Sequence, residues 1–423
     1  MRLQKDKVEI MSPVGSYESL MAAIQGGANS VYFGVGNLNM RSRSAVNFST
    51  DDIKKISAIC QEHAVRTYLT VNTIIYDDEM DTMYKLIDEA KQNNISAIIA
   101  SDLAVIQYAR KTGMEVHIST QCNITNIESV RFFAQYAEVM VTARELSLKQ
   151  VKYIIQQIEK QKIKSPSGNL VEIEIFAHGA LCMAISGKCY ISLDNFNYSA
   201  NRGSCLQPCR RAYHVKDADE EIELAIENKY IMSPKDLCTI GFLDKILQTG
   251  VKVLKIEGRG RSPEYVKTVT RCYREAADAC FEGTYSEEKV NQWMEELKNV
   301  YNRGFWNGYY LGKKTGEWTE RYGSQARKTK IYVGKVINFF TKIKVAEIKI
   351  EANSIQLGDE YVIIGTTTGV YEDTMKEIRV DLKEINIARK GDICSIQTQN
   401  IVRRNDKLYK IIPVCDEDNC NGL

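Results

Sequence analysis

The sequence has 423 residues, of which 44% are hydrophobic and 26% are charged, a composition typical of a globular protein with a large core. The formal net charge of +2 is close to neutral, which excludes a global electrostatic attraction to nucleic acid, so any basic surface must be local. The N-terminal segment lacks the apolar stretch of a signal peptide, and no apolar run of about 18 residues occurs. We therefore expect a cytoplasmic protein without a membrane span.

Short β-rich runs recur along the first two thirds of the chain, and amphipathic helical patterns separate them. The runs are residues 8–13, 30–35, 66–72, 97–102, 115–120, 139–143, 172–179 and 251–258. Strands that alternate with helices favour a parallel sheet, and this number of them predicts a (β/α)₈ barrel within residues 1–312. An insert at about residues 180–250 separates the last two runs and contains the clustered cysteines.

The carboxyl ends of the barrel strands are expected to form the mouth of an active site, because sites of such barrels lie at that end. The polar residues at these ends are Ser12, Asn72, Asp102, Ser119, Gln121, Arg144, Glu145, His178, Glu257 and Arg259. Ser12 and Asp102 precede helical patterns, so capping of those helices is an equal alternative for these two. His178 and Glu257 lie beside the insert, which favours a functional role for them.

The pattern changes after residue 260. Two amphipathic helices come first, and a basic linker follows at residues 313–330. The linker includes Trp318 and Tyr322. Basic and aromatic side chains in one segment can contact phosphates and stack on unpaired bases, although a plain solvated linker fits equally well. From 331 to 423, short alternating segments with Gly, Asn and Asp turns predict a small C-terminal β-barrel.

Five cysteines gather in and beside the insert, namely Cys182, Cys189, Cys205, Cys209 and Cys238. In a reducing compartment such a group indicates metal or redox chemistry rather than disulfides. The gaps between them do not match zinc knuckles, and they suit a [4Fe–4S] cluster at least as well. The alternative is that some are buried structural thiols. We interpret the dispersed cysteines as structural; they are Cys60, Cys122, Cys272, Cys280, Cys394, Cys415 and Cys420.

The motifs "HGALCMAISGKCYIS", "NRGSCLQPCRRAY", "SPKDLC" and "KIEGRGRSPEYV" together resemble the collagenase-like U32 peptidase family. The resemblance covers about residues 8–310, and the C-terminal region resembles the extra domain of the family's tRNA-hydroxylating branch. It implies an oxygen-independent, prephenate-dependent hydroxylase with a [4Fe–4S] cluster that converts the wobble uridine of tRNA to 5-hydroxyuridine. Other branches imply a cytidine of ribosomal RNA or a quinone as acceptor, the latter with a paired paralogue of the same family as partner.

The resemblance assigns roles residue by residue. It places the cluster ligands at Cys182, Cys189, Cys205 and Cys238, with Cys209 as the alternate ligand. Prephenate is a dianion and needs guanidinium anchors, for which the candidates are Arg41, Arg43, Arg144, Arg202, Arg210 and Arg259. The expected catalytic residues are His178 and Glu257 as acid or base groups, with Asn72 and Gln121 from the same mouth.

Two other classes of function stay open at this point. A peptidase would need a nucleophile with a positioned base, and His178 lies four residues before Cys182. No H-E-x-x-H zinc-protease motif is present, however. The second alternative is a non-catalytic RNA-binding protein in which the cluster only holds the insert.

Overall fold

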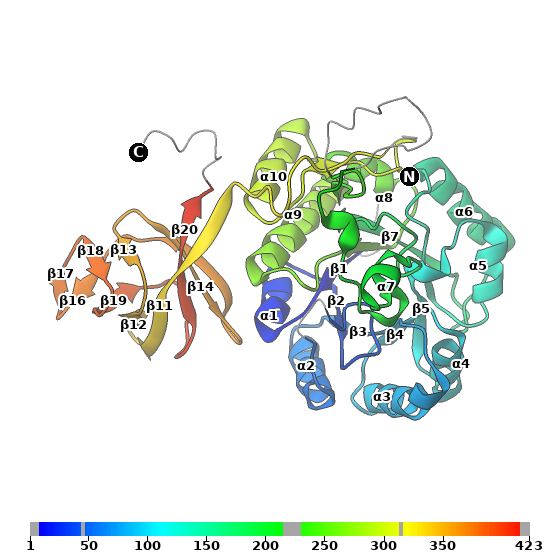
Figure 1. The fold of residues 1–423 in the computed structure, drawn as a ribbon, viewed down its shortest axis with the longest axis horizontal. Coiled ribbons are helices and arrows are strands. Elements are labelled where there is room, and N and C mark those ends of the chain that lie inside the picture. Colours follow the sequence, from blue (N-terminus) through cyan, green and yellow to red (C-terminus); the bar gives the residue numbers. More distant parts are fainter. Residues whose placement is uncertain (1–7, 44–46, 215–229, 313–315, 415–423) are drawn as a thin grey trace.

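The computed structural model describes residues 8–43, 47–214, 230–312 and 316–414. Its first part is the predicted parallel barrel (Figure 1). The barrel strands are β1 (Glu9–Pro13), β2 (Ser30–Gly34), β3 (Arg66–Val71), β4 (Ala97–Ala100), β5 (Glu115–Ile118), β6 (Val139–Val141), β7 (Glu172–Gly179) and β9 (Val253–Ile256). β9 pairs in parallel with both β1 and β7, and this double pairing closes the ring.

Helices surround the strands because each carries an apolar stripe that the barrel wall buries. They are α1 (Tyr17–Gln25), α2 (Thr50–Glu62), α3 (Met80–Gln92), α4 (Leu103–Thr112), α5 (Ile127–Phe133), α6 (Leu148–Gln161), α8 (Leu243–Leu247) and α9 (Pro263–Glu282), with α10 (Glu287–Asn299) beside α9. Among the described helices, none is long and apolar enough to cross a membrane.

For Ser12 and Asp102, helix capping was the alternative to a functional role, and only one of the two caps a helix. Asp102 caps α4, since its carboxylate accepts a hydrogen bond from the Ala104 amide at 2.8 Å. Ser12 does not cap the following helix: it is buried, and its hydroxyl pairs with that of Thr270 at 2.7 Å. Both side chains therefore have structural partners, and neither lines the cavity described below.

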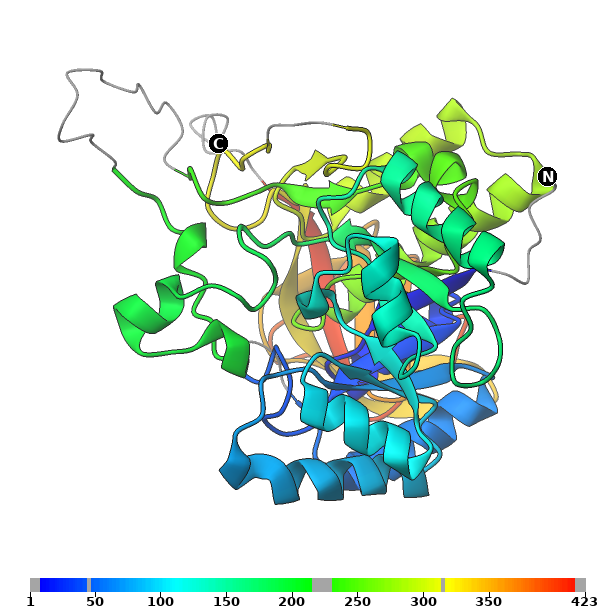
Figure 2. The same cartoon turned by 90° about the vertical axis from the view of Figure 1, so that its right-hand side faces the viewer.

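The insert between β7 and β9 covers one end of the barrel. Its helix α7 (Ile191–Phe196) lies over the ring of strands in Figure 1, and Figure 2 shows the insert displaced to one end of the barrel. A short strand, β8 (Asp236–Cys238), pairs antiparallel with the end of β7, and β10 (Phe305–Trp306) pairs in parallel with β8. The barrel sheet thus extends past the mouth and ties the insert to it.

The predicted linker is docked rather than solvated where the structure describes it. The Lys235 amide donates to Glu317 O at 2.9 Å, and the Thr319 amide donates to Ser233 O at 2.8 Å. The side chain of Arg327 forms an ion pair with Glu295. These contacts hold the segment against the insert and α10. Lys313 and Lys314, two of its basic residues, lie outside the described residues.

The C-terminal β domain is also present as predicted. Its main antiparallel sheet has the order β15-β14-β20-β11-β12-β19-β16-β17, and β13 pairs with β18 beside it. The strands are β11 (Lys328–Phe340), β12 (Val345–Ile350), β13 (Ser354–Gln356), β14 (Glu360–Gly365), β15 (Gly369–Thr374), β16 (Arg379–Val380), β17 (Lys383–Glu384), β18 (Ile387–Arg389), β19 (Ile393–Gln397) and β20 (Lys407–Pro413). A separate apolar core fills this domain.

The two domains pack directly against each other through α1, α9 and β15. The side-chain amide of Gln25 donates to Thr368 O at 2.8 Å and accepts from the Val370 amide at 3.0 Å. Lys267 adds an ion pair with Glu372 at 2.8 Å. Apolar residues of β14 and β15 belong to the same buried cluster as the barrel core, so the β domain has a fixed position on the barrel.

Candidate active site

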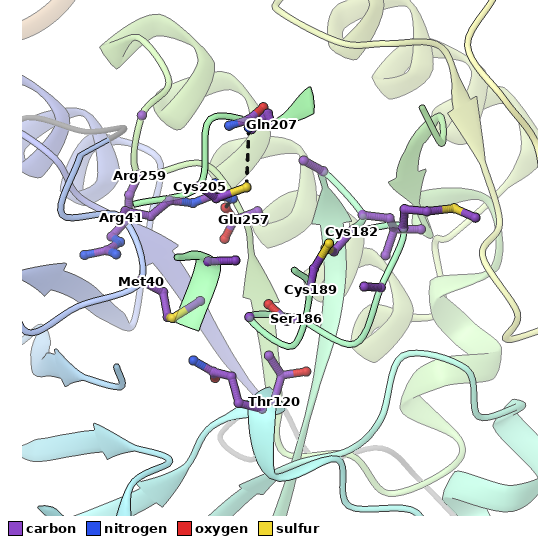
Figure 3. A pocket seen from close by; sticks show the side chains of 18 of the residues that line it. Met40, Arg41, Thr120, Cys182, Ser186, Cys189, Cys205, Gln207, Glu257 and Arg259 are labelled. Atoms are coloured by element: carbon purple, nitrogen blue, oxygen red, sulfur yellow. Dashed lines mark hydrogen bonds and ion pairs between the residues drawn. The ribbon is translucent and has the colours of Figure 1, made fainter. Parts of the chain in front are cut away.

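A cavity of about 300 Å³ lies at the carboxyl ends of the barrel strands, under the insert (Figure 3). Strand-end residues form one side of it, among them Asn72 after β3, Arg144 after β6 and Glu257 after β9. The insert forms the other side. Because parallel strands of a barrel all end at the same rim, side chains far apart in sequence meet in this space.

Four thiols of the insert line this cavity: Cys182, Cys189, Cys205 and Cys209. All cysteines of the described residues are free thiols. The Cys205 Sγ accepts a hydrogen bond from the Gln207 amide at 3.4 Å. Burial raises the pKa of Cys205, and it raises the pKa of Cys209 to about 11. In each case the neighbouring thiols add to the increase, which shows that the sulfur atoms are close enough to interact.

Cys238 lies apart from these four cysteines and does not line the cavity. It is 4% exposed at the end of β8, where its Sγ is 3.7 Å from the Met294 Sδ and accepts from the Tyr273 hydroxyl at 3.9 Å. Burial raises its pKa to about 11. The structure therefore brings Cys209, the alternate ligand, together with Cys182, Cys189 and Cys205, and it does not bring Cys238 to them.

Four free thiols at one cavity form a donor set of the kind that binds thiolate-ligated metal groups. In the parts of the chain that the structure describes, no three His, Cys, Asp or Glu side chains are arranged to hold a single metal ion.

The six predicted arginine anchors fall into two groups. Those that line the cavity are Arg41, Arg144, Arg210 and Arg259. The other two are outside it. Arg202 forms a bidentate ion pair with Glu79, and Arg43 lies over the ring of Tyr198 at 3.9 Å from its centroid. These outer arginines hold the insert and the adjoining loops in place.

Among the arginines at the cavity, most have partners within the protein. Arg41 forms an ion pair with Glu257 at 2.5 Å. Arg259 donates to Thr70 Oγ1 at 3.1 Å and to Asn39 Oδ1 at 2.9 Å. The guanidinium of Arg210 donates to three oxygen atoms, the carbonyl oxygens of Leu181 and Pro234 and the hydroxyl of Ser233, so its role is to fix the insert.

Arg144 and Arg261 differ from these because neither forms an ion pair with any described residue. Arg144 lies over the ring of Phe176 at 3.9 Å from its centroid, and its Nε has no hydrogen-bond partner in the described part of the chain. Burial lowers the pKa of Arg144, and the nearby Glu257 carboxylate offsets this lowering in part. Arg261 lies over Tyr301 at 3.5 Å. Two guanidinium groups that form no ion pair with a described residue lie at one cavity, which favours an anionic ligand there.

Glu257 is the carboxylate of the cavity. Burial alone would raise its pKa, but Arg41, Arg144 and Arg259 lower the pKa to about 2. The Tyr32 hydroxyl also donates to it at 3.2 Å. Glu257 is therefore ionised near neutral pH, where it can hold cationic groups or accept a proton but cannot act as an acid.

His178 does not line the cavity, although it lies in β7 together with Phe176, which does. It is 1% exposed and packs between the rings of Tyr265, Tyr273 and Phe305. Burial lowers its pKa to about 3, so the imidazole is neutral near pH 7. In this position it cannot exchange a proton with a ligand in the cavity.

Asn72 and Gln121 both line the cavity and belong to one hydrogen-bond network. The Gln121 side chain donates to Asn72 O at 2.8 Å, and the Ser119 hydroxyl donates to Gln121 Oε1 at 2.5 Å. Asn72 Oδ1 accepts from the Met40 amide at 3.2 Å. Both amides therefore tie together the segments that follow β2, β3 and β5.

Sequence reasoning missed three cations of the cavity: Arg261, Lys255 and Arg303, the last of which forms an ion pair with Asp236 at 3.4 Å. Arg261 was open to prediction, because it lies two residues after Arg259 in the same glycine-rich turn. Lys255 lies within β9 and forms a buried ion pair with Glu174 at 2.7 Å. The sequence did not reveal Lys255, because the run "VKVLKIEG" resembles an ordinary strand and the lysine side chain turns inward only when the barrel closes.

Several known proteins are similar to this chain. The model of peptidase family U32 matches residues 15–320. A "Collagenase" of Porphyromonas gingivalis is 57% identical over 402 residues, which cover 95% of this chain and 97% of that protein. The "tRNA hydroxylation protein P1" of Bacillus subtilis is 30% identical over 397 residues, with 92% and 91% covered. A solved U32 peptidase aligns with a TM-score of 0.39 at 11% identity, over 59% of this chain and 93% of that one.

Proposed function

The chain belongs to peptidase family U32, and from this premise we propose that it is an iron–sulfur enzyme that hydroxylates the wobble uridine of tRNA to 5-hydroxyuridine, with prephenate as co-substrate and without molecular oxygen. One observation carries the proposal: four thiols and two guanidinium groups that form no ion pair with a described residue share a cavity that no described histidine lines. The relative whose name refers to tRNA hydroxylation is 30% identical, so membership of the family does not by itself establish tRNA as the substrate.

In this proposal, Cys182, Cys189, Cys205 and Cys209 hold a [4Fe–4S] cluster. When bound, such a cluster supplies one-electron transfer. The protein's contribution is the insert, which brings four thiols from one segment over the barrel mouth, and Arg210, whose three hydrogen bonds fix that segment. The cluster would then lie against the strand-end residues rather than on the outer surface.

Arg144 and Arg261 are the proposed anchors of the two carboxylates of prephenate. A guanidinium group binds a carboxylate through paired hydrogen bonds, and although one Arg144 nitrogen donates to Ala180 O at 3.3 Å, no described carboxylate forms an ion pair with either arginine. Arg41 is a weaker candidate because Glu257 already compensates its charge. Glu257 in turn holds Arg41 and accepts the Tyr32 hydrogen bond, so it orients the wall of the cavity.

A collagenase-type peptidase is the second candidate, and the more identical relatives favour it by name. A thiol peptidase requires an imidazole or another base beside its nucleophile. His178 packs among aromatic rings away from the four thiols, and Glu257 is engaged by Arg41. The geometry therefore supports the redox enzyme better than the peptidase. Hydroxylation of ribosomal RNA or of a quinone would use the same cavity with a different acceptor.

Mass spectrometry of tRNA nucleosides from a strain that lacks the gene tests this choice. We expect loss of 5-hydroxyuridine and its derivatives, restored by the wild-type gene and not by Cys209→Ser. In parallel, anaerobically purified protein should not degrade gelatin. Unchanged nucleosides, together with gelatin hydrolysis that Cys182→Ser abolishes, would establish the peptidase instead.

A further inference from the structure

A second cavity, of about 410 Å³, adjoins the first one. The two share residues Leu181–Ser186 of the insert except Ile185, and they also share Thr120 and Arg144. Cys182 and Arg144 therefore belong to the lining of both cavities. A volume in this range is typical of ligand pockets rather than of packing defects.

Aromatic rings form the outer wall of the second cavity. Trp306 of β10 meets Tyr309 edge to face, with ring centroids 5.3 Å apart, and Trp318 lies beside them in the same lining. Trp318 is not on a free linker, because it bridges to Pro234 and its neighbours bond to Ser233 and Lys235. A rigid aromatic wall of this kind is suited to stacking against a flat ring.

The polar atoms without partners at this cavity are donors. Trp306 is 5% exposed, and its indole Nε1 has no acceptor among the described residues. The Nε of Arg144 also has none. Buried N–H groups nearly always have acceptors, and both residues line this cavity, so a ligand that carries carbonyl oxygens is the kind that could supply them. Met183 and Ile185, both exposed apolar side chains, complete the lining.

We propose that the second cavity is the subsite that receives the target base of a single-stranded RNA segment, stacked on Trp318 and Trp306. The inference rests on the proposed function and adds the acceptor's position: the base lies in the second cavity, and the small dianion with the cluster lies in the first. A pyrimidine ring fits because it combines a flat face with ring carbonyls. A collagen-like peptide also carries carbonyl oxygens, but it has no flat aromatic face to stack on the tryptophans.

Fluorescence titration of the holoenzyme with an eight-residue oligouridine tests this subsite. The chain has three tryptophans, and two of them line the cavity, so stacking should quench the emission. Trp318→Ala should weaken binding by roughly tenfold or more, since one stacked base is worth that much. Trp318→Phe should keep most of the affinity. The matched control is Tyr322→Ala, an exposed aromatic residue of the same segment outside the cavity, which should bind within about twofold of wild type.

Iron content and thermal unfolding establish that each variant is folded. Wild-type affinity of a folded Trp318→Ala variant would overturn the subsite, as would quenching by a collagen-like peptide in place of oligouridine. The nucleoside assay separates the two proposals. Hydroxyuridine that depends on the protein but not on Trp318 leaves the function standing and removes the subsite. Trp318-dependent RNA binding with unchanged nucleosides leaves the subsite and removes the function.

Discussion

At the scale of single residues, the position of a residue at a strand end predicted much of the cavity lining. The direction of each side chain decided which of these residues line the cavity. Asn72, Arg144 and Glu257 line it because the parallel strands end together. His178 does not, although Phe176 two residues earlier does. The pairing of β7 with β9 shifts register between these residues, so the simple alternation of sides fails there. Sequence periodicity cannot show such a shift, because tertiary pairing causes it.

The choice of the fourth thiol gives the first prediction. Cys182→Ser, Cys189→Ser, Cys205→Ser and Cys209→Ser should each lose most of the bound iron, because each removes a ligand at the shared cavity. Cys238→Ser should keep it, since that thiol packs against Met294 and Tyr273 instead. Iron and sulfide analysis of anaerobically purified protein provides the measurement. Iron loss in Cys238→Ser with iron retained in Cys209→Ser would reverse the assignment.

The Arg41–Glu257 pair gives a prediction on pH dependence. The folded-state pKa of Glu257, about 2, is below the ordinary value of 4.5, so its ionisation stabilises the fold above pH 4.5, and this stabilisation is lost as pH falls toward 2. Glu257→Gln should therefore lower the free energy of unfolding by roughly 2–3 kcal/mol at pH 7. The gap to wild type should narrow below about pH 4.5. Urea unfolding at several pH values provides the test.

Glu145→Gln is the matched control, because this carboxylate is exposed at the rim of the second cavity. Its unfolding free energy should stay within about 0.5 kcal/mol of wild type at every pH. A Glu257→Gln gap that does not change with pH would show that the carboxylate is not held ionised by its arginine neighbours.

At the scale of elements, long periodic segments were predictable and short ones were not. All the barrel runs became strands, and their alternation with helices was sufficient to predict the ring. β8 and β10 were missed because strands of two or three residues have no periodicity of their own. The docked segment around Trp318 was missed for a related reason: its contacts with residues 233–235 are formed across a distance that the sequence does not reveal.

The junction of β7 and β9 gives a prediction at this scale. Gly179 has a φ of 107°, and a Cβ atom there would lie 2.5 Å from Glu257 O. Gly179→Ala should therefore destabilise the fold by about 2–4 kcal/mol and disturb the Arg41–Glu257 pair. Gly168→Ala is the control, since its φ is 85° but no atom lies within 4 Å, and it should cost only about 1 kcal/mol. Equal losses in the two variants would refute the contact.

At the scale of the whole molecule, the β domain is part of the barrel's packing rather than an appendage. If the β domain is a second contact for tRNA, deletion of residues 331–423 should weaken tRNA binding and leave the iron content intact. The structure adds that deletion would expose apolar residues of the barrel surface, since Val362, Ile364 and Val370 pack there. Point variants at the interface are therefore cleaner probes than truncation.

Gln25 is suited to a point variant that tests the interface between the two domains. Gln25→Ala removes both of its hydrogen bonds to β15 and the loop before it, which should cost about 1–3 kcal/mol at the interface. We expect faster amide hydrogen exchange at residues 368–371 and weaker tRNA binding, with unchanged iron content. Gln92→Ala, at the exposed end of α3, should change none of these. Unaltered exchange at 368–371 would show that the domains are held by apolar packing alone.

Leu181, Cys182, Met183 and Ala184 line both cavities, and this has a consequence for turnover if the two cavities bind the two reactants as proposed. An occupant of one cavity would then restrain these residues for an occupant of the other, and reciprocity requires each to change the other's affinity by the same factor. Two independent pockets would instead bind their ligands in random order with constant affinities. Substitutions in these four consecutive residues should therefore alter the Michaelis constants of both reactants together.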